Sequence, residues 1–214
     1  MNRIILKKRK EMMDMINKFY EKDELYDALD IGTTNDMEYY HSNFLIKNLK
    51  NIKAYKSISN QKIDSSFFIK TLNKSILEKF STDEIDNYSS DLVLSNATIE
   101  HVGNSANQLQ MISNIIALTK KNFVLITPNR SHPIDFHTQI PVIHWLPKKI
   151  HRKILSLIGL KFYSKEENLN LLSTIDLVNF LNNFDNIEYE IRYIKFLGFK
   201  SNCIIFGKLK TIKN

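Results

Sequence analysis

The residues best suited to chemistry lie in a polar run that directly follows an apolar one. Residues 91–95 are expected to form a buried strand, and Ser95 and Asn96 open a polar stretch that includes the adjacent pair Glu100 and His101. Ligands of open α/β sheets bind at the carboxyl ends of the strands. We therefore expect this stretch to line a ligand site.

A second candidate is the turn at Gly32, which follows the apolar run 25–31. A glycine at a strand end lets the backbone approach a ligand closely. A helix starting after this turn would present its amide groups to a carboxylate. Turns of the Asp-x-Gly type, such as that of Asp30 and Gly32, are also common at strand ends without any ligand. This pattern alone therefore does not show whether the turn binds one.

Residues 128–147 form a long segment after the fifth predicted strand, and segments of this length in a compact domain are usually functional. The histidines in it and just beyond it are His132, His137, His144 and His151. A histidine with a near-neutral pKa can take a proton from a substrate hydroxyl. His137 is our first candidate for this role, with His144 and His101 as alternatives. Histidines that only hold the loop in shape would give the same pattern.

Metal binding is the second role considered for these histidines, because histidine and Asp135 are both good ligands for zinc and similar ions. Their spacing fits no compact metal motif, and the chain has one cysteine. We therefore expect no metal site.

The candidate substrate-binding residues of the same segment are Asn129, Arg130, His132 and Trp145. Arg130 would either clamp an anionic group of the substrate or form a salt bridge that pins the loop. Trp145, the only tryptophan, would either form a pocket wall or pack beside Pro147.

Alternating strand-like and helical patterns indicate βαβ units. The expected strands are 25–31, 52–58, 67–72, 91–95, 122–127, 187–196 and 202–209. The expected helices begin near Ser42, at Asn104 or Ser105, at Pro147 and at Thr174 after a Ser173 cap, and a leading helix carries Met12, Met13, Ile16 and Tyr20. This predicts an α/β fold with a doubly wound, Rossmann-like sheet of seven strands, mostly parallel, closed by a C-terminal antiparallel hairpin.

Composition sets further limits. The chain has 214 residues, a net charge of +7 and 43% hydrophobic residues, which suits one globular domain. Its single cysteine, Cys203, lies in an apolar run and is expected to be a buried thiol in a cytoplasmic protein. No run of about 18 apolar residues is present. The positive charge is mostly lysine spread along the chain, so we do not expect a nucleic-acid partner.

Residues 148–158 predict a basic amphipathic helix, with Ile150, Ile154, Leu157 and Ile158 on one face. Such a helix can lie on an anionic membrane, so peripheral membrane contact is one interpretation. The more common one is a helix whose apolar face packs on the core.

The sequence also resembles a known family. Residues 29–32 (Leu-Asp-Ile-Gly) resemble the first motif of class I S-adenosylmethionine-dependent methyltransferases, and residues 91–102 resemble their fourth-strand motif. Residues 127–138 and 144–147 are similar to segments of bacterial small-molecule methyltransferases of the methyltransferase-11 type. The resemblance extends over residues 25–172.

The resemblance implies S-adenosylmethionine as cofactor and a role for each matching position. Gly32 and Thr33 would form the turn under its methionine part, and Asp30 would order that turn. Ser95 and Asn96 would line the cofactor near the methyl group, and Glu100 and His101 would begin the helix that walls the site.

Two positions depart from the family pattern, which usually has acidic residues there. Ser59 stands near the end of the second strand, where an acidic residue holds the ribose hydroxyls, and Asn73 follows the third strand, near the adenine. Both can form hydrogen bonds, but neutral groups form weaker ones than a carboxylate.

The sequence therefore predicts a methyltransferase acting on a small-molecule acceptor, such as a sugar or a cell-envelope precursor. The alternative is a catalytically inactive Rossmann-like module that serves as a partner or membrane-surface subunit. We expect one domain over 1–214: a leading helix at 1–22, a cofactor-binding half at 25–127, a substrate-covering segment at 128–172, and a helix with the closing hairpin at 173–214. The oligomeric state is not predicted.

Overall fold

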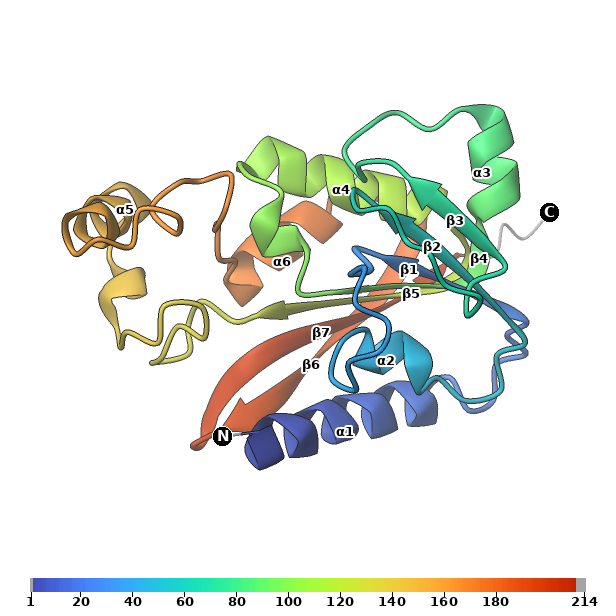
Figure 1. Cartoon of the computed structure of the whole chain (residues 1–214), viewed down its shortest axis with the longest axis horizontal. Helices are drawn as coiled ribbons and strands as arrows, with labels where there is room; N and C mark the ends of the chain where they lie inside the picture. The colour runs from blue at the N-terminus through green and yellow to red at the C-terminus, as the bar shows by residue number, and fades with distance from the viewer. Residues whose placement is uncertain (1, 211–214) are drawn as a thin grey trace.

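The computed structural model describes residues 2–210, and its elements follow the expected alternation (Figure 1). The helices are α1 (Asn2–Phe19), α2 (Phe44–Lys47), α3 (Thr82–Tyr88), α4 (Ser105–Ala117), α5 (Lys148–Leu157) and α6 (Thr174–Leu181), with short 3₁₀ turns η1 (Ile99–His101) and η2 (Ile143–Trp145). The strands are β1 (Asp27–Ile31), β2 (Ala54–Ser59), β3 (Lys70–Asn73), β4 (Ser90–Asn96), β5 (Thr119–Pro128), β6 (Ile187–Phe196) and β7 (Phe199–Leu209).

The strands form one seven-stranded sheet in the order β3-β2-β1-β4-β5-β7-β6. The pairs among β1 to β5 are parallel, whereas β7 is antiparallel to both β5 and β6. The predicted mostly parallel, Rossmann-like sheet with a closing hairpin is confirmed. Because the chain runs outward from β1 through β3 and then returns to β4, the switch point of the sheet lies between β1 and β4.

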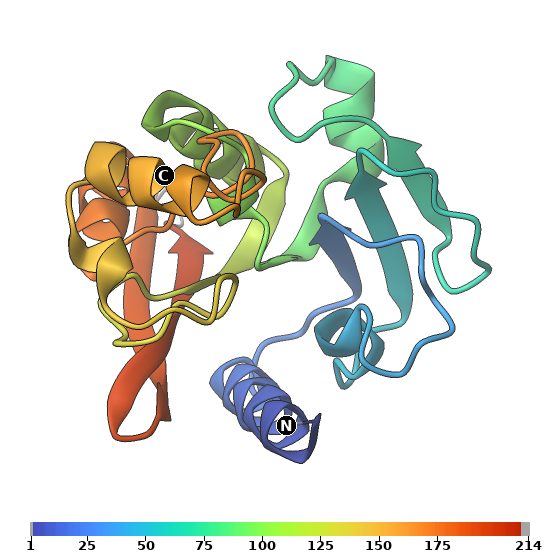
Figure 2. The same cartoon turned by 60° about the vertical axis from the view of Figure 1, so that its left-hand side comes forward.

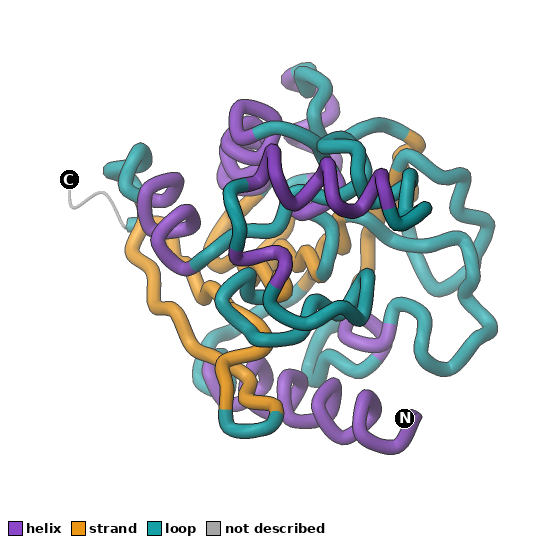
Figure 3. Tube along the Cα trace, turned by 90° about the vertical axis from the view of Figure 1, so that its left-hand side faces the viewer, coloured by secondary structure: helices purple, strands orange, loops and turns teal. Residues whose placement is uncertain are grey.

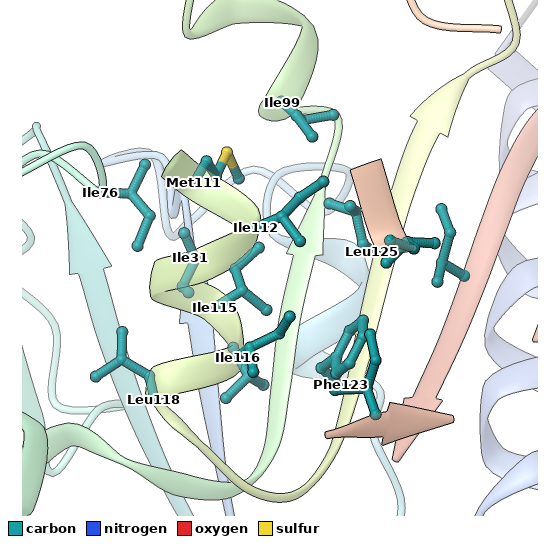
Figure 4. Packing of buried hydrophobic residues seen from close by; sticks show 14 of the residues in the cluster. Ile31, Ile76, Ile99, Met111, Ile112, Ile115, Ile116, Leu118, Phe123 and Leu125 are labelled. Atoms are coloured by element: carbon teal, nitrogen blue, oxygen red, sulfur yellow. The ribbon is translucent and has the colours of Figure 1, made fainter. Parts of the chain in front are cut away.

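One face of the sheet is covered by α4 and α6. In α4, Met111, Ile112, Ile115 and Ile116 are buried and pack toward strand residues such as Ile31 and Leu125 (Figure 4). Asn104 caps α4 by accepting a hydrogen bond from the Asn107 amide. In α6, Ser173 forms a capping box with Asp176, which confirms the predicted cap.

The opposite face is covered by α1 and α2 (Figure 2). The predicted apolar residues of α1, namely Met12, Met13, Ile16 and Tyr20, are all buried there. Because both faces are covered, β4 carries buried apolar residues on both sides, with Leu92 and Leu94 on the α1 face and Val93 on the α4 face.

The closing hairpin is tighter than expected. Its turn consists of Leu197 and Gly198 alone, both with positive φ, so β7 begins at Phe199 rather than at 202. Gly207 of β7 pairs with Phe123 of β5, and a side chain at position 207 would overlap the Phe123 ring. Cys203 is buried on the same strand, and burial raises the pKa of its thiol to about 11.

Other boundaries also differ from the sequence prediction. The helix expected to begin near Ser42 is a single turn that begins at Phe44, and it is preceded by Asn43 in the left-handed region. Pro147 is the N-cap of α5 rather than its first helical residue. In α4, Gln108 is fully buried whereas the neighbouring Leu109 is only half-buried. No helix within residues 2–210 combines the length and apolarity needed to cross a membrane.

Candidate functional site

The two predicted strand tips lie side by side at the switch point. Ile31 at the end of β1 pairs with Ser95 near the end of β4, and the next residues, Gly32 and Asn96, are both exposed. The Ser95 hydroxyl donates a hydrogen bond to the Ile31 carbonyl over 3.1 Å, which joins the tips. Figure 3 looks onto the end of the molecule that carries α5, where loops dominate.

A polar network of short side chains holds the turn after β1. The Thr33 hydroxyl donates to the Asp30 carboxylate over 2.6 Å and accepts from the Ser57 hydroxyl over 2.8 Å. The Ser59 hydroxyl donates to the Thr33 carbonyl over 2.6 Å. This network holds the backbone of Gly32 and Thr33 against the ends of β1 and β2.

Asp30 is almost fully buried at the centre of this network. Burial raises the pKa of its carboxyl to about 6, although the hydrogen bond from Thr33 opposes this shift. A buried carboxylate that costs stability at neutral pH is typical of a residue retained for function.

Thr98 closes one side of the turn. A Cβ on Gly32, whose φ is +88°, would overlap the Thr98 side chain. The Thr98 hydroxyl also donates toward the Ile31 carbonyl over 3.4 Å. The space directly between the two tips is thus filled by Thr98, and a ligand would have to lie over the exposed side of Gly32 and Asn96.

Ser59 and Asn73, the neutral residues at the two positions where the family pattern usually has acids, both form hydrogen bonds within the protein. Besides holding Thr33, the Ser59 hydroxyl accepts a hydrogen bond from the Gln61 amide over 3.1 Å. Asn73 is exposed and donates to the Ser59 carbonyl over 3.1 Å. These contacts tie the ends of β1, β2 and β3 together. Of the Asn73 side chain, the amide NH₂ is used in this way and the carbonyl oxygen remains available to a ligand.

No helix starts directly after the Gly32 turn. The next helix, α2, begins at Phe44 and is a single turn of four residues. The amide groups expected there for a carboxylate are therefore not supplied by a helix. The segment between is held by Asn43, whose side chain accepts from the Thr34 amide over 2.9 Å.

Beyond β4, Glu100 forms the centre of a cluster of ionisable side chains. It lies in η1, before α4, rather than at the start of that helix. Its side chain is 0% exposed, one carboxylate oxygen accepts from the Thr127 hydroxyl over 2.9 Å, and the other, Oε1, has no hydrogen-bond partner among residues 2–210. Glu100 Oε1 faces His137 Nε2 at 3.8 Å and His101 Nε2 at 4.0 Å.

Both histidine rings are oriented from their far side. His137 Nδ1 lies 3.2 Å from Asp135 Oδ1, and His101 Nδ1 lies 2.6 Å from the Asn168 carbonyl, which can only accept. Although burial opposes both shifts, the contact with His137 lowers the pKa of Asp135 to about 2, and Asp135 and Glu100 raise the pKa of His137. The cluster thus unites two predicted catalytic residues, His137 and His101, with Glu100.

The other predicted residues of the segment 128–147 shape its backbone. His144 is buried, and its Nε2 lies 2.7 Å from the His132 carbonyl. Arg130 donates to the carbonyls of His144 and Leu146 over 3.0 and 2.8 Å. His132 and Asn129 are also buried and bonded to main-chain groups. In this geometry these side chains hold the loop, and Trp145, half-exposed, is the one of the set that is open to solvent.

The apolar face of α5 points away from the core, in contrast to the more common interpretation of its sequence. Ile150, Leu157 and Ile158 are 50, 77 and 53% exposed. The residues of α5 that are buried are His151 and Leu155. This exposed face is bordered by Lys149 and Lys153, which are exposed as well.

A cavity of about 470 Å³ lies at the opposite edge of the sheet. It is lined by α1 and by the residues that precede β1 and β2, such as Leu25 and Ile52. Since these are the amino ends of the strands, this cavity is remote from Gly32 and Asn96, and we do not assign the site to it.

Sequence reasoning missed three contacts of the site. Thr98 lies within the motif 91–102, but its residue type indicates no contact with Gly32. Asp135 is a good metal ligand by type, but its position two residues before His137 is a local signal for their contact. The contact between Glu100 and Thr127 joins two separate motifs, and nothing in the spacing indicates it.

Comparison with known proteins supports the fold. No protein-family model matches the sequence, and no curated protein matches it. Among solved structures, magnesium protoporphyrin IX methyltransferase ChlM from Synechocystis PCC 6803 with bound S-adenosylmethionine is 8% identical, with a TM-score of 0.55 over 96% of this chain and 82% of that chain. N-methyltransferase NodS from Bradyrhizobium japonicum WM9 is 8% identical, with a TM-score of 0.55 over 95% of this chain and 97% of that chain.

A third similar structure is the small RNA methyltransferase HEN1, which is 11% identical with a TM-score of 0.60. The match covers 94% of this chain and 25% of that chain, so this chain spans about a quarter of HEN1. At such low identity these likenesses show that the chain has the fold of class I methyltransferases.

The contact between Gly32 and Thr98 predicts a coupled effect on stability. Gly32→Ala should lower the free energy of unfolding by about 2–4 kcal/mol, because it adds strain at positive φ and a clash with Thr98. In a Thr98→Ala background the clash is removed, so Gly32→Ala should cost clearly less. Urea unfolding of the two single variants and the double variant measures this, and equal costs in both backgrounds would refute the contact.

Because Asp30 is buried, Asp30→Asn should raise the free energy of unfolding by an amount that depends on pH. A folded-state pKa of about 6 exceeds the unfolded value of 3.8, so the folded state binds the proton more tightly and the wild type loses stability as the pH rises from about 4 to 6. The advantage of Asp30→Asn over wild type should grow by up to about 3 kcal/mol across this range. Urea unfolding at pH 4, 5, 6 and 7 measures it. A difference that stays constant with pH would contradict the burial of a charged Asp30.

Proposed function

We propose that this protein is an S-adenosylmethionine-dependent methyltransferase that acts on a small-molecule acceptor. The observation that carries the proposal is the convergence of the Gly32 turn and the Asn96 tip at the switch point of this sheet, because ligands of doubly wound folds bind there. Similar folds crystallised with this cofactor, such as ChlM, support the choice of ligand.

The residues present fit the cofactor in part. Gly32 and Asn96 are both exposed. The bare backbone of Gly32 and the side-chain amide of Asn96 are therefore available to the methionine end of the cofactor. The neutral Asn73 stands where a carboxylate is usual, and Ser59 is engaged, so the adenosine end would be held by weaker hydrogen bonds. We therefore expect modest affinity for the cofactor.

The cofactor, when bound, supplies an electrophilic methyl group on a sulfonium. Since this donor is already activated, the protein has to hold the acceptor in line with the methyl group and receive its proton. We assign the second task to the cluster of Glu100, His101 and His137, which begins four residues after Asn96. His144 is not part of it, because its ring is buried under the loop.

The class of acceptor that we propose rests on the resemblance to the methyltransferase-11 type. The motifs similar to the methyltransferase-11 type, including residues 127–138, support a bacterial small-molecule branch and a sugar or cell-envelope precursor as acceptor. The segment that carries His137 would cover this acceptor. An RNA acceptor, such as the small RNA for which HEN1 is named, is not adopted, because the lysines of this chain form no stripe in the sequence.

Calorimetric titration with S-adenosylmethionine and S-adenosylhomocysteine, in EDTA, tests the proposal. Both should bind one molecule per chain, and no heat from either at about 1 mM would overturn it. The double variant Gly32→Ala/Thr98→Ala should bind at least about 10-fold more weakly, since it places a methyl group where the cofactor contacts the backbone. Thr98→Ala alone is the matched control and should bind like wild type.

We further propose that the exposed face of α5 contacts an anionic membrane surface, which would suit a lipid-linked acceptor. The face combines exposed Ile150, Leu157 and Ile158 with Lys149 and Lys153, as in helices that lie in the membrane interface.

Cosedimentation with phosphatidylglycerol vesicles tests this contact. Leu157→Ser should reduce the bound fraction about 10-fold, because it removes apolar surface that would be buried in the interface. Ile175→Ser is the matched control, since Ile175 of α6 is 72% exposed but distant in sequence from the basic face. Equal retention of wild type by neutral phosphatidylcholine vesicles, or equal loss in both variants, would contradict the proposal.

A further inference from the structure

The cluster of Glu100, His101 and His137 is arranged as a set of metal ligands. Glu100 Oε1 and the Nε2 atoms of the two histidines all lie within 4.8 Å of one another. We propose that these three side chains bind a divalent transition-metal ion such as Zn²⁺. Two imidazoles and one carboxylate form a known ligand set for such ions, and three protein ligands leave positions open for a substrate.

Each of the three side chains forms a hydrogen bond on the side away from the cluster, and this leaves one acceptor atom of each directed at the other two. In both histidines Nδ1 is directed at an oxygen, of Asp135 and of the Asn168 carbonyl, so in the neutral ring Nδ1 carries the proton and Nε2 carries the lone pair. Glu100 Oε2 accepts from Thr127, which turns Oε1 toward the same point. Such outer hydrogen bonds are the usual support of metal ligands.

The buried carboxylate supplies the independent observation. Glu100 is 0% exposed, yet its Oε1 has no hydrogen-bond partner within residues 2–210. A buried charged oxygen without a partner is costly, and two facing lone pairs on nitrogen do not relieve that cost. A cation at the shared point satisfies all three atoms at once.

The ligand chemistry selects the class of ion. Imidazole nitrogen suits zinc and its neighbours, whereas magnesium and calcium prefer oxygen ligands throughout. The 3.8 and 4.0 Å separations of Glu100 Oε1 from the two nitrogens are compatible with metal–ligand bonds of about 2.0–2.2 Å after a small inward movement.

This inference deepens the proposed function but does not require it. In a methyltransferase, an ion here would coordinate the acceptor hydroxyl and favour loss of its proton to solvent water, because the ligand atoms of the cluster would then be occupied by the ion. Binding of the ion itself depends only on the three side chains. Titration with Zn²⁺ alone, after removal of metals with EDTA and without any methyl donor, therefore separates failure of this inference from failure of the proposed function.

Calorimetry with Zn²⁺ should show one ion per wild-type chain. His101→Ala should weaken binding by about 100-fold or more, and because the His101 side chain is 37% exposed, this variant should fold. Glu100→Gln should have a similar effect. Asp135→Asn, which alters the support of His137 and the hydrogen bond from the Thr138 hydroxyl but removes no ligand, should weaken binding about 10- to 100-fold.

His151→Gln is the control, since His151 is a nearby buried histidine outside the cluster, and it should bind Zn²⁺ like wild type. The metal-free melting temperature of each variant establishes that it is folded. The inference is overturned if wild type binds no Zn²⁺ at about 1 mM, or if folded His101→Ala binds as tightly as wild type. The former result would indicate that a proton on His137, rather than a metal ion, compensates Glu100, and the latter that Zn²⁺ binds outside this cluster.

Discussion

The parallel pairing of β1 with β4 is the constraint on which the site depends. These strands are far apart in the chain, yet their tips are locked together, since the Ile31 carbonyl accepts hydrogen bonds from both Ser95 and Thr98. This lock fixes the distance between the Gly32 turn and the polar stretch after β4. It also places Glu100 within reach of Thr127, near the end of β5, and of His137 in the loop that follows this strand.

Around that lock, short hydroxyl side chains hold the turn after β1, and one of them, Ser59, stands where the family pattern usually has an acid. Ser57, Ser59 and Thr33 satisfy one another and the backbone, and a single carboxylate, Asp30, lies beneath them. The network gives the turn rigidity without added charge. For the function that we propose, recognition at this edge would rely on shape and neutral hydrogen bonds.

The sequence was a good guide wherever one local pattern decided the structure. The periodicity of Met12, Met13 and Ile16, the Ser173 cap and the closing strands each depend on neighbours within a few residues. It was a poor guide where packing decided. The short α2 was missed, and for α5 the sequence left open whether the apolar face packs on the core, because periodicity shows that a helix has an apolar face but not what covers it. The convergence of Glu100 and His137 depends on tertiary contacts that no spacing encodes.

The position of α1 has a consequence for how the chain acquires its structure. Phe19 at the end of α1 stacks on Phe206 of β7 with ring centroids 4.3 Å apart, and Tyr20 donates to the Phe123 carbonyl of β5. Helix α1 therefore packs on strands that follow it in the chain only after β1 to β4. Such non-local pairing slows folding, and until it forms, the apolar face of α1 stays exposed and available to chaperones.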